Sequence, residues 1–125
     1  MMKKLLYVED NEDNIYMLSN RLQREGFMVV VARNGSEGVE LAQREQPDLI
    51  IMDLVLPEMD GFEATRELRL STATRNIPVI ALSASVLPED QQRAIDAGCD
   101  EFEIKPVNFT DLLEKIDRFL KAGKS

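Results

Sequence analysis

The sequence predicts an α/β fold, namely a single, doubly wound (βα)5 domain whose five-stranded parallel sheet has the strand order 2-1-3-4-5. Short apolar runs alternate with amphipathic runs along all 125 residues. The middle three apolar runs are almost wholly apolar, as is typical of parallel strands covered on both faces. No internal repeat, low-complexity segment or linker interrupts the alternation. Right-handed crossovers would therefore place helices on both faces of one sheet.

Each apolar run is short and rich in valine, isoleucine, leucine or aromatic residues, which favours strands. We expect the second, third and fourth strands to be buried on both faces. The five predicted strands are residues 4–8, 27–32, 49–52, 78–82 and 101–104.

The first two helices are predicted from spacing and from their ends. Residues 13–25 carry Met17, Leu18 and Leu22 on one predicted apolar stripe, and Gly26 follows as a stop signal. The second helix covers residues 34–44. It opens with a cap residue, Asn34, and has Glu37 three positions on, as a capping box requires.

The other three helices are expected over residues 61–70, 88–97 and 108–121. The first of these has apolar residues at helical spacing. The second begins with Pro88, which suits a first turn, and stops at Gly98. The last begins with Asn108 and carries one apolar stripe of leucine and isoleucine.

Composition excludes several classes of function. The net charge of −8 is repelled by nucleic acid and by anionic membranes. No apolar run approaches the ~20 residues of a membrane span, and the first residues lack the pattern of a signal peptide. The single cysteine, Cys99, fits a reducing compartment, so we expect a cytoplasmic protein. Because the chain has no histidine, Ser-His-Asp catalysis and histidine-ligated zinc are excluded.

Polar residues follow four of the predicted strands, and ligands of parallel α/β sheets bind at that edge. These residues are Glu9, Asp10, Asp53, Ser83 and Lys105. Carboxylates packed together repel one another, which raises their pKa values unless a cation joins them. A hard divalent ion with oxygen ligands, Mg²⁺ or Mn²⁺, would meet that need. A lone aspartate at a strand end is more often a turn or cap residue, so the prediction rests on the group.

Four motifs resemble the receiver domain of two-component response regulators: LYVEDNEDN, PDLIIMDLVLPEMDGFEATRELR, IPVIALSAS and AGCDEFEIKPV. They cover nearly the whole chain in the family's order and spacing. The resemblance implies a flavodoxin-like receiver domain over residues 1–125, with no output domain. It also implies a stand-alone regulator that is not an enzyme beyond catalysing its own phosphorylation and dephosphorylation.

The resemblance further assigns roles at the site. Asp53 is the implied phosphoacceptor, with Glu9, Asp10, Asp53 and the backbone carbonyl of Val55 as implied ligands of the metal ion. The implied phosphate-binding groups are Lys105, Ser83 and the backbone of Ala84. Ser83 and Phe102 occupy the switch positions, and the Lys105–Pro106 peptide bond is usually cis in such proteins. Ser83 as a plain strand-end residue and Phe102 as a core aromatic remain alternatives.

A partner must supply the phosphoryl group, because the chain has no histidine of its own. The resemblance implies a histidine kinase or a histidine-phosphotransfer protein in a phosphorelay. It also implies a downstream protein target on the face of the fourth helix, fifth strand and fifth helix. Ile15 and Tyr16 are candidates for docking the donor, although Ile15 at the boundary of the core is an equal alternative.

Three rival functions would each need residues different from those in this chain. A flavodoxin-like electron carrier needs a phosphate loop after the first strand, where this chain has Glu9, Asp10 and Asn11 instead. A phosphatase of the haloacid-dehalogenase type needs a second acid two residues beyond its nucleophile, where this chain has Val55. A degenerate receiver that binds partners without phosphate would lack an acid or the lysine, which are all present here.

Overall fold

The computed structural model describes residues 2–122 and has the predicted architecture. Five parallel strands are arranged in the order β2-β1-β3-β4-β5. The strands are β1 (Lys4–Val8), β2 (Met28–Ala32), β3 (Leu49–Asp53), β4 (Val79–Ser83) and β5 (Glu101–Ile104). The helices are α1 (Glu12–Arg24), α2 (Gly35–Glu45), α3 (Gly61–Leu70), α4 (Pro88–Ala97) and α5 (Phe109–Ala122). The predicted bounds agree to within one residue at each end.

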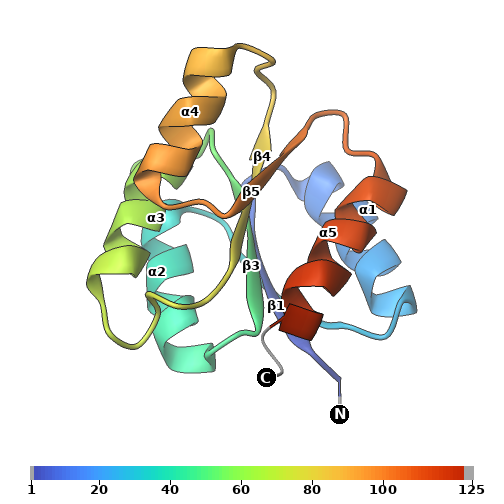
Figure 1. Cartoon of the computed structure of the whole chain (residues 1–125). Coiled ribbons are helices and arrows are strands. Elements are labelled where there is room, and N and C mark those ends of the chain that lie inside the picture. Colours follow the sequence, from blue (N-terminus) through green and yellow to red (C-terminus); the bar gives the residue numbers. More distant parts are fainter. Residues whose placement is uncertain (1, 123–125) are drawn as a thin grey trace.

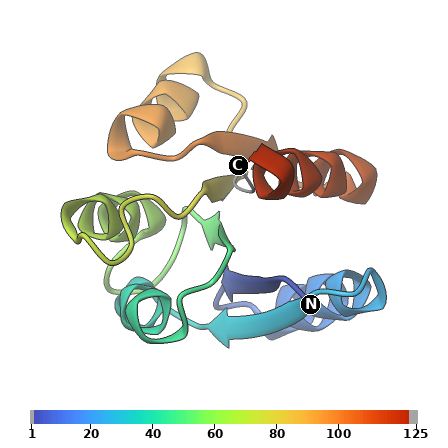
Figure 2. The ribbon, with the colours of Figure 1, turned by 60° about the horizontal axis from the view of Figure 1, so that its bottom comes forward.

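Helices cover both faces of the sheet. Figures 1 and 2 show α1 and α5 on one face and α2, α3 and α4 on the other. Side chains alternate along each strand, so Leu6 and Val8 of β1 join the core beneath α2, α3 and α4, whereas Leu5 and Tyr7 join the core beneath α1 and α5. Two apolar layers therefore hold β1 and β3 rigidly at the centre of the fold.

The prediction that β2 is covered on both faces was wrong. Its residues Met28 to Val31 are exposed or half-buried, whereas β3 and β4 are buried throughout. β2 is the edge strand next to β1, so it has only one neighbouring strand and less cover from the helices. The apolar content of a run therefore does not predict whether the strand lies at the centre or at the edge of the sheet.

The predicted caps form, with one difference. The Asn34 side chain accepts a hydrogen bond from the Glu37 amide at 2.8 Å, as expected at the start of α2. The Glu37 carboxylate, however, accepts from the Arg33 amide at 2.6 Å instead of closing a capping box with Asn34. Asn108 caps α5 in the same way, by accepting from the Asp111 amide at 3.0 Å.

The apolar stripe of α1 is rotated relative to the prediction. Met17 is exposed, and the buried residues are Ile15, Leu18, Ser19 and Leu22. These have the i, i+3, i+4, i+7 spacing of one helical face. Ile15 therefore belongs to the core, which confirms the alternative noted for it. Within residues 2–122, no helix combines the length and the apolar character that crossing a membrane requires.

Candidate functional site

Three predicted residues meet at the carboxyl edge of the sheet. Asp53 is the last residue of β3, Glu9 follows β1 directly, and Lys105 follows β5. Both carboxylates are only 2 % exposed. The Lys105 Nζ atom forms an ion pair with Asp53 Oδ2 and lies 3.7 Å from Glu9 Oε1. The parallel sheet thus places one lysine over two buried acids.

Backbone amides fix both carboxylates. Asp53 Oδ1 accepts a hydrogen bond from the Val55 amide at 2.8 Å, and Glu9 Oε2 accepts from the Asn11 amide at 3.2 Å. Glu9 Oε1 also accepts from the Tyr7 hydroxyl at 3.3 Å. Tyr7 was not a predicted site residue. Its position two residues before Glu9, where alternation places both side chains on the same side of the chain, is the signal that could have indicated it.

The site has a surplus of negative charge. Burial raises the pKa of Glu9 to about 7, helped by its hydrogen bond with Asp53 and by repulsion from that carboxylate. The Asn11 amide and the Lys105 ammonium group act in the opposite direction but do not outweigh the increase in the Glu9 pKa. Burial and the nearby Glu9 also raise the pKa of Tyr7, whose hydroxyl therefore stays protonated. One lysine does not neutralise two buried acids.

Asp10 does not join the other two acids. Its side chain is exposed. In the part of the chain from residue 2 to residue 122, no group of three or more acidic, histidine or cysteine side chains is arranged to hold a metal ion. The donor chemistry still fits a hard divalent cation, because two buried carboxylates offer oxygen ligands and carry uncompensated charge. Glu9 and Asp53 are the residues that would hold such an ion.

Ser83 ends β4 and connects to α4 through its neighbours. Its buried hydroxyl accepts from the Ser85 amide at 3.1 Å. The Ser85 hydroxyl in turn donates to Asp90 Oδ2 at 2.6 Å and accepts from the Leu87 amide at 3.1 Å. Asp90 lies in the first turn of α4. The sequence suggests Ser83 and the backbone of Ala84 in this segment but does not indicate the link from Ser85 to α4, since a serine in a loop carries no local signal of its partner.

The remaining predicted residues lie around this centre. Phe102 is half-buried in β5 and packs against the core beneath α4. Ala84 is exposed, and the Lys105–Pro106 peptide bond is cis, as predicted. On α1, Ile15 is 7 % exposed and Tyr16 is 71 % exposed. Ile15 is therefore a core residue and not a docking candidate, whereas Tyr16 remains one.

Comparison with known proteins decides the family. Residues 5–117 match the family described as the response regulator receiver domain. This chain belongs to that family. Receivers of this kind act in two-component and phosphorelay signalling. Membership sets aside the electron-carrier and phosphatase alternatives, whose characteristic residues the chain also lacks.

Relatives of this receiver resemble it along nearly its whole length. The polar-differentiation response regulator DivK of Brucella anthropi is 37% identical over 120 residues, which cover 96% of this chain and 98% of that protein. The receiver domain of a Pseudomonas aeruginosa sensor histidine kinase, with a magnesium ion coordinated in its active site cleft, superposes with a TM-score of 0.90 at 33% identity. That match covers 97% of this chain and 99% of that one.

A third relative was solved in a complex. It is the receiver domain of the Saccharomyces cerevisiae response regulator Ssk1, co-crystallised with the histidine phosphotransfer signaling protein Ypd1. The TM-score is 0.86 and the identity 30%, over 94% of this chain and 88% of that one. A receiver of this fold is therefore known in contact with a histidine phosphotransfer protein.

Proposed function

We propose that this receiver accepts a phosphoryl group on Asp53 from a phosphohistidine of a separate kinase or phosphotransfer protein. The observation that carries the proposal is the buried Asp53 carboxylate, which is held by Lys105 and lies next to Glu9 at the carboxyl edge of the sheet. The chain has no histidine, so another protein must act as donor. The complex of the Ssk1 receiver with Ypd1 supports a donor of that kind.

The chain's own residues account for the main requirements of the transfer. The Val55 amide holds Asp53 Oδ1, and Lys105 holds Oδ2, so the carboxylate has a fixed orientation. A carboxylate oxygen of Asp53 attacks phosphorus. An O–P bond forms while the N–P bond of the donor breaks, and its electron pair returns to the imidazole nitrogen. Such transfers depend on positioning and on cations that spread charge off the phosphoryl oxygens, which is the role we assign to Lys105.

We propose Glu9, Asp53 and the backbone carbonyl of Val55 as metal ligands, with Mg²⁺ or Mn²⁺ as the ion. Asp10, whose side chain is exposed, would complete the set by turning toward the bound ion. When bound, the ion would neutralise the surplus negative charge and the charge of the phosphoryl group. The burial of Glu9 beside the Asp53 carboxylate supports the assignment, because burial and the neighbouring Asp53 both raise the Glu9 pKa and a bound cation would favour the ionised form. The magnesium ion in the related Pseudomonas receiver supports it as well.

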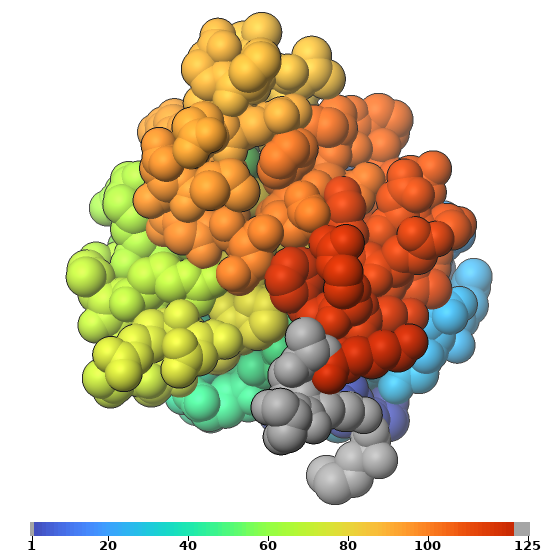
Figure 3. Space-filling view, viewed as in Figure 1, coloured from blue at the N-terminus to red at the C-terminus, as the bar shows by residue number. Residues whose placement is uncertain are grey.

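The output would be a change of surface and not a chemical product. Ser83 and the Ala84 amide would bind the new phosphoryl group, and Phe102 would respond to the movement of Ser83. The α4, β5 and α5 segments lie side by side on one face of the molecule (Figure 3). We propose this face for a downstream protein target, in a cytoplasmic receiver that binds no nucleic acid. Catalysis would be limited to its own phosphorylation and dephosphorylation.

The donor would dock beside the site, along α1. Tyr16 and Met17 are both exposed apolar residues on this helix. They follow the N-cap, Asn11, which lies two residues beyond Glu9. A partner helix seated on this pair would present its phosphohistidine to Asp53.

A labelling experiment tests the proposed function. The wild type and an Asp53→Asn variant are incubated with Mg²⁺ and a phosphorylated histidine-phosphotransfer protein, and the mass gain of one phosphate is mapped. We expect labelling of the wild type alone, with Asp117→Asn, an exposed change on α5, labelled like the wild type. Undiminished labelling of the Asp53→Asn variant would refute Asp53 as the acceptor.

A further inference from the structure

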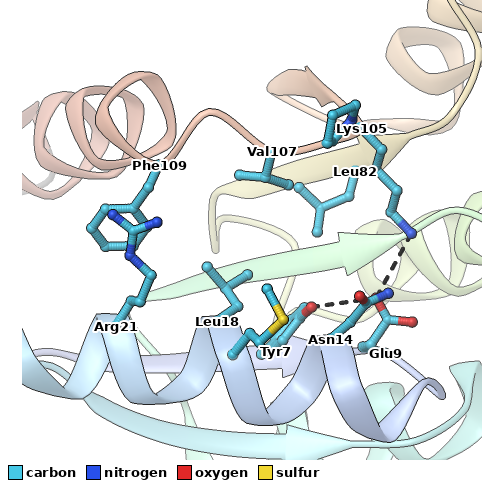
Figure 4. Close-up of a pocket in the computed structure, with 11 residues that line it drawn as sticks. Tyr7, Glu9, Asn14, Leu18, Arg21, Leu82, Lys105, Val107 and Phe109 are labelled. Atoms are coloured by element: carbon cyan, nitrogen blue, oxygen red, sulfur yellow. Dashed lines mark hydrogen bonds and ion pairs between the residues drawn. The ribbon is translucent and has the colours of Figure 1, made fainter.

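Tyr7 is a polar aromatic residue inside an apolar layer. It is 1 % exposed and packs with Leu22 of α1 and Leu112 of α5 in the core beneath those helices. A buried tyrosine needs a partner for its hydroxyl. The partner is Glu9, whose side chain continues on the same face of β1 and receives the hydrogen bond on Oε1 (Figure 4). The Tyr7 side chain therefore contacts Glu9 from within the apolar core beneath α1 and α5.

Glu9 is held by two hydrogen bonds and one ion pair from different parts of the fold. The Asn11 amide binds Oε2, and Lys105 lies near Oε1 while also pairing with Asp53. The Tyr7 hydroxyl is the one side-chain donor that the described residues give to Glu9 alone. Its 3.3 Å separation is longer than is usual for a hydroxyl and a carboxylate. The hydroxyl thus makes a long hydrogen bond to Oε1, the same oxygen that faces the lysine.

We propose that Tyr7 is a positioning residue for Glu9, which turns the carboxylate toward Asp53 and so strengthens divalent-cation binding at the site. The inference rests on the proposed function. Glutamate has one more rotatable bond than aspartate, so its carboxylate needs more orientation to act as a ligand.

The surroundings of Tyr7 allow the contribution of its hydroxyl to be tested separately from the packing of its ring. Tyr7 and Glu9 line the same pocket of about 510 Å³ between α1 and the segment after β5 (Figure 4). The apolar wall beside the ring includes Leu18 and Leu82. A phenylalanine at position 7 would keep these contacts and lose only the hydrogen bond. Tyr7→Phe therefore tests orientation and not packing.

The experiment measures Mg²⁺ affinity calorimetrically with the metal ion alone. We expect Tyr7→Phe to weaken Mg²⁺ binding by about tenfold, the usual effect of removing a group that orients a ligand. Glu9→Asp withdraws the carboxylate by one methylene from the hydroxyl, so Tyr7→Phe should have no added effect in that background. Leu22→Met is the control, since it alters packing in the same core without touching the site.

Three results would overturn the proposal. These are an unchanged affinity in Tyr7→Phe, an equal loss in the Glu9→Asp background, and an equal loss in Leu22→Met. If the wild type neither binds Mg²⁺ nor becomes phosphorylated on Asp53, the proposed function fails separately. The metal-free amide NMR signal of Asn11 then decides the orienting role. A shift in Tyr7→Phe but not in Leu22→Met supports it, and an unchanged signal overturns it.

Discussion

The ammonium group of Lys105 forms an ion pair with the carboxylate of Asp53 across 52 positions of the sequence. The lysine is partly exposed, whereas the aspartate is buried. The same Nζ atom lies 3.7 Å from the second buried acid, Glu9. The Lys105 ammonium group therefore faces two carboxylates. A second cation at the site would neutralise the remaining negative charge.

Replacing Lys105 should lower the stability of the folded protein. Without Lys105, two buried carboxylates face each other with no counter-charge. We expect Lys105→Met to lower the free energy of unfolding by roughly 1–3 kcal/mol in EDTA, a range reduced because the lysine is partly exposed. Urea unfolding measures the loss, and Mg²⁺ should restore part of it. Lys121→Met, an exposed change on α5, should cost less than about 0.5 kcal/mol; equal losses would contradict the assignment.

The raised pKa of Glu9 predicts a pH dependence of stability. With a pKa of about 7 in the folded protein and 4.5 ordinarily, Glu9 binds a proton in the folded state that the unfolded chain has released. The free energy of unfolding therefore falls as the pH rises from about 4.5 through 7. In EDTA, we expect Glu9→Gln to be more stable than the wild type at pH 8, by on the order of 1–3 kcal/mol.

That difference should shrink toward pH 4.5 and vanish below it, where Glu9 becomes protonated in both states. Thermal or urea unfolding at several pH values measures it. Glu63→Gln serves as control, because Glu63 is exposed on α3. A difference between Glu9→Gln and the wild type that stays constant from pH 4.5 to 8 would mean that Glu9 keeps an ordinary pKa.

Ser85 should couple the end of β4 to the start of α4. Its hydroxyl binds Asp90 at 2.6 Å and the Leu87 amide at 3.1 Å, while its amide binds Ser83. The N-cap of α4, Leu87, has no capping side chain of its own. We expect Ser85→Ala to cost about 1 kcal/mol and to speed hydrogen exchange of the amides in the first turn of α4.

Hydrogen exchange followed by NMR or mass spectrometry checks this expectation. Ser36→Ala is the matched control, since Ser36 is exposed in the first turn of α2. If exchange in α4 is the same in Ser85→Ala as in Ser36→Ala, the connection through Ser85 does not hold the helix.

Arg69 should be a structural clamp that lysine cannot replace. Its guanidinium group donates to the backbone carbonyls of Gly98, Arg75 and Ile77 and pairs with Asp100 at 2.9 Å. A lysine has one ammonium group and cannot reach these acceptors together. We expect Arg69→Lys to lower the free energy of unfolding by about 2 kcal/mol, because several partly buried acceptors lose their donors together. Urea unfolding measures the loss. Arg66→Lys, an exposed change on α3, is the control and should change the free energy of unfolding by less than about 0.5 kcal/mol. An equally small change for Arg69→Lys would show that the Arg69 contacts do not stabilise the fold.

Much of the fold was available from the sequence, because local periodicity and end signals act between near neighbours. The third and fourth helices, 61–70 and 88–97, have the predicted bounds, and Gly98 has the positive φ of 112° that ends α4. The convergence of Glu9, Asp53 and Lys105 could also be predicted, since all three stand at the carboxyl ends of parallel strands. Which face of α1 is buried could not be predicted from the sequence. Met17 and Ile15 are both apolar, and only packing against the sheet decides which one is buried.

The sequence by itself determined the order of the elements, the edge of the sheet that carries the polar residues, and the identity of the acids and the lysine there. The tertiary structure decided that β2 is an open edge, that Lys105 pairs with Asp53, that Asp10 stays exposed, and that Tyr7 and Ser85 support the site. The physical reason is the separation along the chain over which each kind of interaction acts. Hydrophobic spacing is read within one or two helical turns, whereas a hydrogen bond or an ion pair depends on where distant strands bring their side chains within about 3 Å of each other.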